Sequence, residues 1–321
     1  MKLINSSVNT INPVSYTLDN VYKMIELAGR TCYKSEDKIT ETSAKEFVNR
    51  MIKSGHGAML EHGTVYLKVP TSIVSHGFIT GNNWRCLMDN PYTKATHDDS
   101  YTYFTTNYRV IVENDLEGVL EYICEPTEHH EKRITIRFIC DRGVSHEFVR
   151  HRVFSFAQES TRYCNYSKDK FGNELTFIIP CWLNIPEGKY TNIAKQSNED
   201  GEYKQIMLHE NNINAYPLTT TSEGRFLWNC YWDEHDYFDL LNYDWKPQEA
   251  RAILSNSLKT ELIMTGFVSD WKHFFELRCA PSAHPDARKL ALELLHKIHT
   301  DYNFEELYEK YKDETKVNQS V

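Results

Sequence analysis

The chain has 321 residues, 45 of them acidic and 36 basic, which gives a formal net charge of −9. Because phosphate binding needs a basic surface, this balance disfavours a general nucleic-acid-binding protein, and any anion site must be a local concentration of arginine. Apolar residues at 40% and charged residues at 25% exclude wholesale disorder and allow one large domain or two ordinary ones.

The cysteines and the apolar segments indicate the cellular compartment in which the protein is expected. No two of the eight cysteines form a CxxC pair, so neither a zinc ribbon nor a redox dithiol is indicated, and we interpret them as free thiols. Residues 1–14 contain no apolar segment of a secretory signal. No apolar run approaches the roughly 20 residues that span a bilayer. We therefore expect a soluble, cytoplasmic protein with no membrane partner and no metal.

The first segments in chain order predict two helices. Apolar side chains in residues 20–34 recur on one helical face. Residues 43–63 predict a second helix, in which Ser43 and Glu46 have the spacing of a capping box and Gly55 is a plausible stop.

The next segments predict two strands and a further helix. Alternation over 64–69 and again over 134–141 is typical of strands. Residues 70–131 are polar and irregular, and we interpret them as an elaboration of the core. Residues 143–156 fit a helix, with Ser145 as a weak cap candidate.

The remaining chain predicts loops and then helices. Residues 167–225 are loop-rich. Helical features return in three segments, 246–266 with Pro247 near its start, 269–278 capped by Ser269, and 284–302 with Pro285 at its start. We expect the tail, 310–321, to fray. Strands and helices mix without a regular βαβ alternation, which favours the α+β class.

Three adjacent cationic or near-cationic residues, Arg150, His151 and Arg152, stand out because such neighbours repel one another. On a helix the two arginines point about 200° apart and grip two different ligands, or one ligand and a neighbouring subunit. On an extended segment they share a face. Ser160 and Arg162 follow as a hydroxyl ligand and a bidentate anion donor. The alternative is a solvated basic helix end, where cations suit the dipole.

The pattern of Arg150-His151-Arg152, seven residues and then Ser160 resembles the signature of the flavin-dependent thymidylate synthases. Two other segments resemble that family in the expected order: a His-x-x-x-x-Glu-His segment and a pair of C-terminal arginines 27 residues apart. The matched residues of these two segments are His56, Glu61, His62, Arg251 and Arg278. The family has asparagine where this chain has His273, and its usual histidine is displaced at His284.

The resemblance implies an α+β fold in which a mixed sheet packs with helices, the thymidylate synthase-complementing protein fold. It implies a single domain over 1–321, with insertions at about 70–131 and 167–240. It also implies a homotetramer in which several subunits build each site.

The implied reaction is the reductive methylation of dUMP to dTMP. Methylenetetrahydrofolate is the carbon donor, reduced FAD supplies the hydride, and NADPH restores the flavin. FAD and dUMP bring three phosphates and folate adds a carboxylate, so converging arginines have several anions to bind. C5 of uracil is a poor nucleophile, and it improves when an arginine stabilises negative charge on the ring.

The resemblance assigns roles to individual residues. Arg278, which polarises the uracil ring, Ser160 and His56 are implied to be catalytic, with Ser160 a ligand rather than a nucleophile. The implied dUMP-binding residues are Gln158, Ser160, Thr161, Arg162, Arg251 and Arg278. The implied FAD-binding residues are Glu61, Arg150, His151, Arg152 and His273.

Rival functions rest on the same residues. A zinc hydrolase would use His146 and His151, but five residues place them about 140° apart on a helix, whereas zincins need a spacing of four. A nucleotide- or nucleic-acid-binding protein without catalysis is the second alternative, and the acidic net charge opposes its nucleic-acid form. Cys164 is interpreted as a packing residue, since nothing indicates a depressed thiol pKa.

Overall fold

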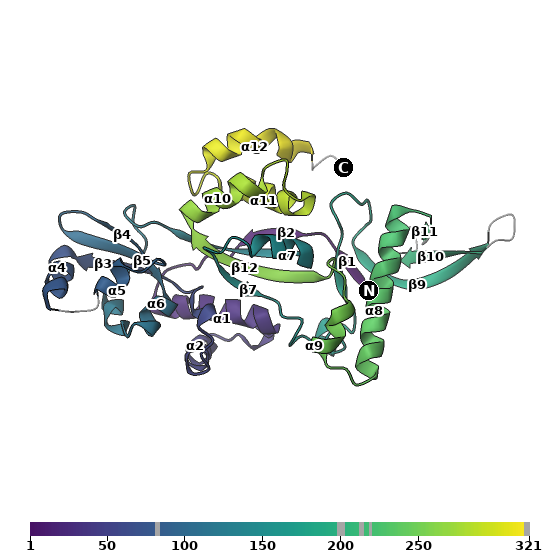
Figure 1. Ribbon diagram of the computed structural model, residues 1–321, viewed down its shortest axis with the longest axis horizontal. Coiled ribbons are helices and arrows are strands. Elements are labelled where there is room, and N and C mark those ends of the chain that lie inside the picture. Colours follow the sequence, from purple (N-terminus) through teal and green to yellow (C-terminus); the bar gives the residue numbers. More distant parts are fainter. Residues whose placement is uncertain (81–83, 198–202, 212–214, 218–219, 318–321) are drawn as a thin grey trace.

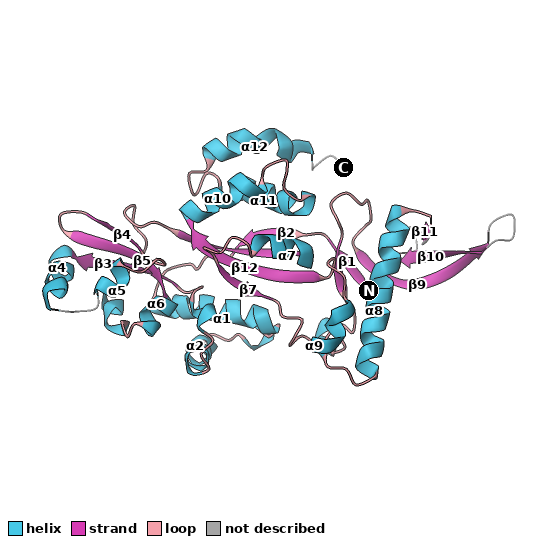
Figure 2. Cartoon of the chain, in the orientation of Figure 1, coloured by secondary structure: helices cyan, strands magenta, loops and turns pink. Residues whose placement is uncertain are grey.

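The computed structural model describes the chain except residues 81–83, 198–202, 212–214, 218–219 and 318–321 (Figure 1). A four-stranded antiparallel sheet lies at the centre, in the order β2-β6-β12-β7. Its strands are β2 (Ser7–Thr10), β6 (Arg133–Asp141), β7 (Ser155–Gln158) and β12 (Lys259–Phe267). Figure 2 shows these strands between two sets of helices, which confirms the α+β class.

The strand β12 corrects the predicted helix over 246–266. Only its start is helical, as α9 (Pro247–Ala250) and the 3₁₀ turn η4 (Arg251–Ile253), and Pro247 occupies the first turn as expected. β12 pairs with β6 over its whole length, from Lys259 opposite Asp141 to Phe267 opposite Arg133, and with β7 on its other edge. Because both of its faces are covered, β12 is buried along almost its whole length and shows no alternation of apolar and polar residues, so periodicity does not identify it as a strand.

Helices cover both faces of the central sheet (Figure 1). On one face, aromatic and aliphatic side chains of four helices pack on Phe138 of β6 and on Leu262 and Met264 of β12. These helices are α7 (Arg142–Phe148), α10 (Val268–Arg278), α11 (Pro285–Ile298) and α12 (Glu305–Val317). On the other face, Ala28 of α1 (Leu18–Tyr33) packs against Ala157 and Ile263.

The second helix is interrupted where the sequence indicates a stop. It divides into α2 (Ser43–Lys53) and α3 (Gly57–Leu60), and Gly55 between them has a left-handed φ of 71°. Glycine adopts that conformation without the steric cost of a side chain, which explains the break.

Residues 70–131 are far more regular than expected. β3 (Thr64–Pro70) pairs with β5 (Tyr101–Asn107), which pairs with β4 (Lys94–His97), in a separate three-stranded sheet. Phe104 of β5 and Trp84 stack in the core beneath it. The helical elements of this region are α4 (Thr71–Thr80), α5 (Trp84–Met88), α6 (Tyr108–Glu113) and η2 (Glu117–Tyr122).

Residues 167–225 are likewise not mainly loop. They contribute to a five-stranded sheet in the order β11-β10-β9-β1-β8, with one long helix packed against it. The elements are β1 (Lys2–Ile4), β8 (Thr176–Ile178), β9 (Gly188–Ser197), β10 (Tyr203–His209), β11 (Ala215–Pro217) and α8 (Ser222–Asn242). Two further 3₁₀ turns, η1 (Glu36–Lys38) and η3 (Asp169–Phe171), complete the chain.

Three predicted serine caps are wrong. Ser43 is the first residue of α2 and not its N-cap, and its hydroxyl donates to the Glu26 carboxylate at 2.8 Å. The N–H of Val144 in α7 is capped by the Asp141 carboxylate at 2.8 Å instead of by Ser145. At α10, Asp270 accepts from the Phe267 N–H at 3.2 Å, and Ser269 lies inside the helix.

The predicted fraying tail, 310–321, is helical as far as Val317, and Tyr311 is buried in the same core as α11, whereas residues 318–321 lie outside the described residues. All eight cysteines are free, as predicted. Within the described ranges, we find no helix with the length and apolarity needed to cross a bilayer.

Candidate active site

The Arg150–Arg152 segment forms a turn, neither helix nor strand. α7 ends at Phe148, and the N–H of His151 donates to the Phe148 carbonyl at 3.1 Å, which leads the chain away from the helix axis. The turn buries His151, 7% exposed, and leaves Arg150 and Arg152 exposed on either side of it. The predicted helix over 143–156 is therefore wrong beyond Phe148, and the extended alternative is wrong as well.

Arg278, the last residue of α10, lies against this turn. Its Nε donates to Nε2 of His151 at 3.0 Å, and its Nη2 donates to the Glu147 carbonyl oxygen at 2.6 Å. Its Nη1 also forms an ion pair with the Glu147 carboxylate. Two of the residues singled out in the sequence, 127 positions apart, thus form one cluster, and every nitrogen of the Arg278 guanidinium has a partner in it.

The imidazole of His151 is held in its neutral form. Burial, followed by the charges of Arg278 and His273, lowers the pKa of His151 to about 4. Because Nε2 accepts from Arg278, the ring proton lies on Nδ1. His273 is exposed, with its ring 6.2 Å from that of His151, so it stands at the edge of this cluster.

A second cluster forms in the loop that follows β7. The Ser160 N–H donates to the Cys32 carbonyl at 3.0 Å, and the Ser160 hydroxyl accepts from the Arg162 N–H at 3.2 Å. Nη1 of Arg251 donates to the Thr161 hydroxyl at 3.0 Å. Ser160, Thr161, Arg162 and Arg251 are therefore brought together, as the sequence led us to expect of an anion site.

The side-chain partners of the two arginines in this second cluster are neutral. Nε of Arg162 donates to the Gln248 amide oxygen at 3.3 Å, and among the described residues the side chain of Arg251 hydrogen-bonds to the Thr161 hydroxyl alone. Gln158 is directed elsewhere, since its amide donates to the hydroxyls of Ser145 at 2.9 Å and Thr260 at 3.2 Å.

The two clusters lie at opposite ends of one strand. His151 precedes β7 and Ser160 follows it, and the four residues of β7 span about 13 Å. β12 runs antiparallel to β7, with Thr265 opposite Ser155 and Leu262 opposite Gln158. Arg251, which precedes β12 in the chain, therefore lies at one end of β7, and Arg278, which follows β12, lies at the other. Within the described part of the chain, β7 therefore separates the two clusters.

His56 and Glu61 lie outside both clusters. Exposed His56 is the residue before α3, and its Nδ1 lies 3.5 Å from the Tyr33 hydroxyl, whose ring packs 5.2 Å from that of Tyr163. His56 is thus linked through Tyr33 to the Ser160 loop. The Glu61 carboxylate instead forms an ion pair with Arg109, Oε1 to Nη1 at 2.6 Å.

His62 and Cys164 are both buried, and the two histidines of the rival zinc site do not converge. His62 is buried, its Nδ1 lies 2.8 Å from the Thr265 hydroxyl, and burial lowers its pKa to about 3. Cys164 is fully buried, and burial raises the pKa of its thiol to about 12, unlike that of a nucleophile. His146 is exposed whereas His151 is buried, so the pair does not face one zinc ion.

A buried ionic network beneath the Ser160 loop was not found from the sequence. Nζ of Lys259 lies 2.8 Å from carboxylate oxygens of both Glu159 and Glu261, and Glu261 also pairs with Lys34 and with Arg137, the latter at 2.7 Å. Burial alone would raise the pKa of Glu261, but Lys259 and Lys34 outweigh it and lower the pKa to about 2. The signal was the Lys259–Glu261 pair, two residues apart on one strand face, hidden by the helical prediction.

The family of the chain follows from comparison with known proteins. The family profile described as "Thymidylate synthase complementing protein" matches residues 14–80 and 113–301, well over half of the chain. The chain therefore belongs to the thymidylate synthase complementing protein family, which confirms the resemblance drawn from its motifs.

Its relatives include proteins named flavin-dependent thymidylate synthase. One from Mycobacterium avium is 23% identical over 288 residues, covering 89% of this chain and 78% of that protein. One from Corynebacterium glutamicum is 27% identical over 177 residues, covering 53% of this chain and 58% of that protein. The chain thus spans little more than half the length of this second relative. A solved structure of the UMP/dUMP methylase PolB from Streptomyces cacaoi aligns with a TM-score of 0.38 and 14% identity, covering 94% of this chain and 93% of that one.

Proposed function

We propose that this chain is a flavin-dependent thymidylate synthase, which methylates dUMP to dTMP with methylenetetrahydrofolate, FAD and NADPH. The observation that carries the proposal is the second cluster. Thr161, Arg162 and Arg251 meet beside Ser160. Among the described residues, the side-chain hydrogen bonds of the two arginines go to a neutral amide and a neutral hydroxyl, which an anionic phosphate can displace. The two guanidinium groups and the hydroxyls of Ser160 and Thr161 suit the phosphate and sugar of dUMP.

Arg278 supplies the other half of the chemistry in this proposal. Its guanidinium stabilises the negative charge that develops at N3 and O2 of the uracil ring as C5 attacks the methylene carbon. His151 and Glu147 hold the guanidinium in place, and neutral His151 adds no competing positive charge. A bound flavin would supply the hydride that completes the methyl group.

The flavin-binding proposal fits the exposed arginines of the turn. Among the residues that the structure describes, neither Arg150 nor Arg152 has an ion-pair partner, so both guanidinium groups can contact the FAD diphosphate. His273 stands at the edge of the same cluster, within reach of the ring system. Glu61 fits less well, because Arg109 already pairs with its carboxylate.

The separation of the two clusters supports the proposed homotetramer. If uracil needs Arg278 and its phosphate needs Arg162 and Arg251, the two clusters of one complete site must come from different subunits, because β7 separates them within one chain. Gln158, whose amide donates to Ser145 of α7 and Thr260 of β12, belongs to the proposed dUMP site as well. We further propose a single domain over 1–321, in which the sheet of β4 and β5 and the sheet of β9 to β11 are insertions.

The test is to incubate the purified protein with dUMP, methylenetetrahydrofolate, NADPH and FAD, and to follow dTMP by chromatography while omitting each component in turn. We expect dTMP only in the complete mixture. A protein that binds dUMP and remains colourless, with no dTMP formed, would instead be the nucleotide-binding protein without catalysis.

A further inference from the structure

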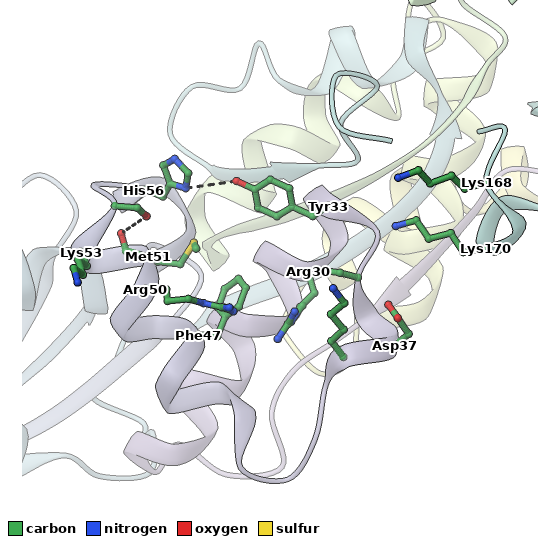
Figure 3. A pocket seen from close by; sticks show the side chains of 13 residues that line it. Arg30, Tyr33, Asp37, Phe47, Arg50, Met51, Lys53, His56, Lys168 and Lys170 are labelled. Carbon is green, nitrogen blue, oxygen red and sulfur yellow. Dashed lines mark hydrogen bonds between the residues drawn. The ribbon is translucent and has the colours of Figure 1, made fainter. Parts of the chain in front are cut away.

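A basic cavity of about 870 Å³ lies beside the proposed active site, between the ends of α1 and α2 and the turn η3 (Figure 3). Six of its thirteen lining residues are cationic and one, Asp37, is acidic. The cations are Arg30, Lys38, Arg50, Lys53, Lys168 and Lys170. In a chain with a net charge of −9, this is a strong local excess of positive charge.

Most of these charges are available to a ligand. Arg30 is not, because it pairs with Glu26 at 3.0 Å. Within the described part of the chain, Lys38, Arg50, Lys53 and Lys168 form no ion pair. Figure 3 shows the ammonium groups of Lys168 and Lys170 directed toward Tyr33 and Arg30, from the side opposite Arg50 and His56.

A purely structural role accounts for only part of the cluster. Arg50 and Lys53 lie in the last turn of α2, where cations interact favourably with the helix dipole. Lys38 belongs to η1, and Lys168 and Lys170 belong to the region of η3, so the dipole of α2 does not explain them. Cations from three separate segments converge on one cavity, which indicates an anion with several charges.

Two aromatic residues in contact connect the wall of the cavity to the proposed site. Tyr33 lines it, contacts His56, and packs on Tyr163, the residue after Arg162. Phe47 and Met51 form an apolar part of its wall. A ligand that reacts beside the Ser160 loop can therefore pass an aryl group along this wall and place carboxylates among the cations beyond.

We propose that this cavity binds the γ-linked polyglutamate tail of the folate co-substrate. The proposal rests on the proposed function, which makes a folate the carbon donor. Each added glutamate contributes one more carboxylate, so a longer tail reaches more of the unpaired cations. Exposed ion pairs are individually weak, and we expect four added glutamates to lower the folate KM about tenfold.

The experiment compares methylenetetrahydrofolate monoglutamate with its pentaglutamate in dTMP formation. The variant Arg50→Gln/Lys168→Gln removes one cation from each side of the cavity. The matched control, Lys45→Gln/Lys132→Gln, removes the same charge at two exposed lysines that do not line it. Thermal unfolding of all three proteins checks that Arg50, which lies 5.4 Å from the Phe47 ring, is not needed for folding.

We expect the KM ratio between the two folates to fall from about tenfold to about twofold in the cavity variant and to stay unchanged in the control. A ratio near one in the unsubstituted protein would overturn the inference while dTMP formation upholds the proposed function. Absence of dTMP with either folate would overturn both. If the cavity variant raises the KM for NADPH but not for NADH, and leaves the folate ratio unchanged, the cations serve the NADPH 2′-phosphate and the inference is wrong.

Discussion

The two arginine clusters at the ends of β7 differ in how their guanidinium groups are engaged. At one end, Arg278 is enclosed by a carboxylate, a carbonyl and an imidazole, and only 13% of its side chain is exposed. At the other, Arg162 and Arg251 are exposed and contact an amide and a hydroxyl. The enclosed arginine is oriented before any ligand arrives, as electrostatic stabilisation of a transition state requires. The exposed arginines are suited to capturing a ligand.

The largest effect is expected at the enclosed end. Arg278→Ala should reduce dTMP formation by a factor of about 10²–10³, because it removes the group proposed to stabilise charge on the uracil ring. Turnover at saturating dUMP measures this, and circular dichroism checks the fold. The control is Arg225→Ala, at an exposed position of α8. Near-normal turnover by the Arg278 variant would remove Arg278 from the mechanism.

The buried ionic network beneath the Ser160 loop, at the exposed end, is expected to contribute to the free energy of unfolding. Glu261→Gln removes the carboxylate that Lys34, Lys259 and Arg137 share, and leaves Lys259 with Glu159 and Lys34 with Glu36. The loss of these charge-assisted contacts should lower the free energy of unfolding by roughly 1–3 kcal/mol. Chemical denaturation at pH 7 measures the loss. An unchanged midpoint would mean that the network contributes nothing net.

The low pKa of the Glu261 carboxylate predicts that the free energy of unfolding falls at acidic pH. Since the folded-state pKa of Glu261, about 2, lies below its ordinary 4.5, its contribution is complete above pH 4.5 and is lost as the pH falls toward 2. The Gln variant should lack that part of the pH dependence, and the difference between the two stability curves isolates it.

A smaller effect is expected from an exposed arginine. Arg251→Ala should raise the KM for dUMP by about tenfold to a hundredfold, with little change in turnover at saturation, because one charge-assisted contact to the nucleotide is lost. The melting temperature should not change, since Arg251 is exposed and its one partner is neutral. An equal fall in turnover would place Arg251 with Arg278 and erase the distinction between the two ends.

The smallest effect concerns the imidazole beside Arg278. The pKa of His151, about 4, should rise in Arg278→Ala without returning to 6.5, because burial is the larger cause and remains. Nitrogen chemical shifts of His151 against pH measure this. Since the folded state favours the neutral ring, His151 should cost stability as the pH falls from 6.5 toward 4, and less so in the variant.

The sequence predicts the motif residues of the proposed site better than it predicts the secondary structure and the side-chain contacts around them. The family resemblance assigned Arg251 and Thr161 to one site, and the structure brings them into contact although most of the helix predicted over 246–266 is a strand. The helical prediction over 246–266 failed because β12 is buried on both faces and has no alternation. The partners of Glu61 and Gln158 also could not be predicted from the sequence. Arg109 and Ser145 come into contact with them only through tertiary packing.

The elaborated regions were least predictable. Polar residues over 70–131 suggested irregular chain, yet β4 and β5 pair there over an apolar core that they share with α1 and α2. Short strands with many threonines and tyrosines bury one face only after the sheet has formed, and composition does not show that in advance. The turn at Arg150 was missed for a related reason: the bond from His151 N–H to the Phe148 carbonyl is local, but no proline or glycine marks it.

The length of β12 fixes the distance between Arg251 and Arg278, which belong to the two proposed parts of the active site. One arginine sits just before β12 and the other one helix after it, and nine consecutive pairings with β6 leave no slack in between. An extra or missing residue there would exchange inward and outward side chains along the remainder of the strand and move one arginine relative to the other. Length variation among natural variants should therefore fall in the outlying hairpins, and never between Lys259 and Phe267.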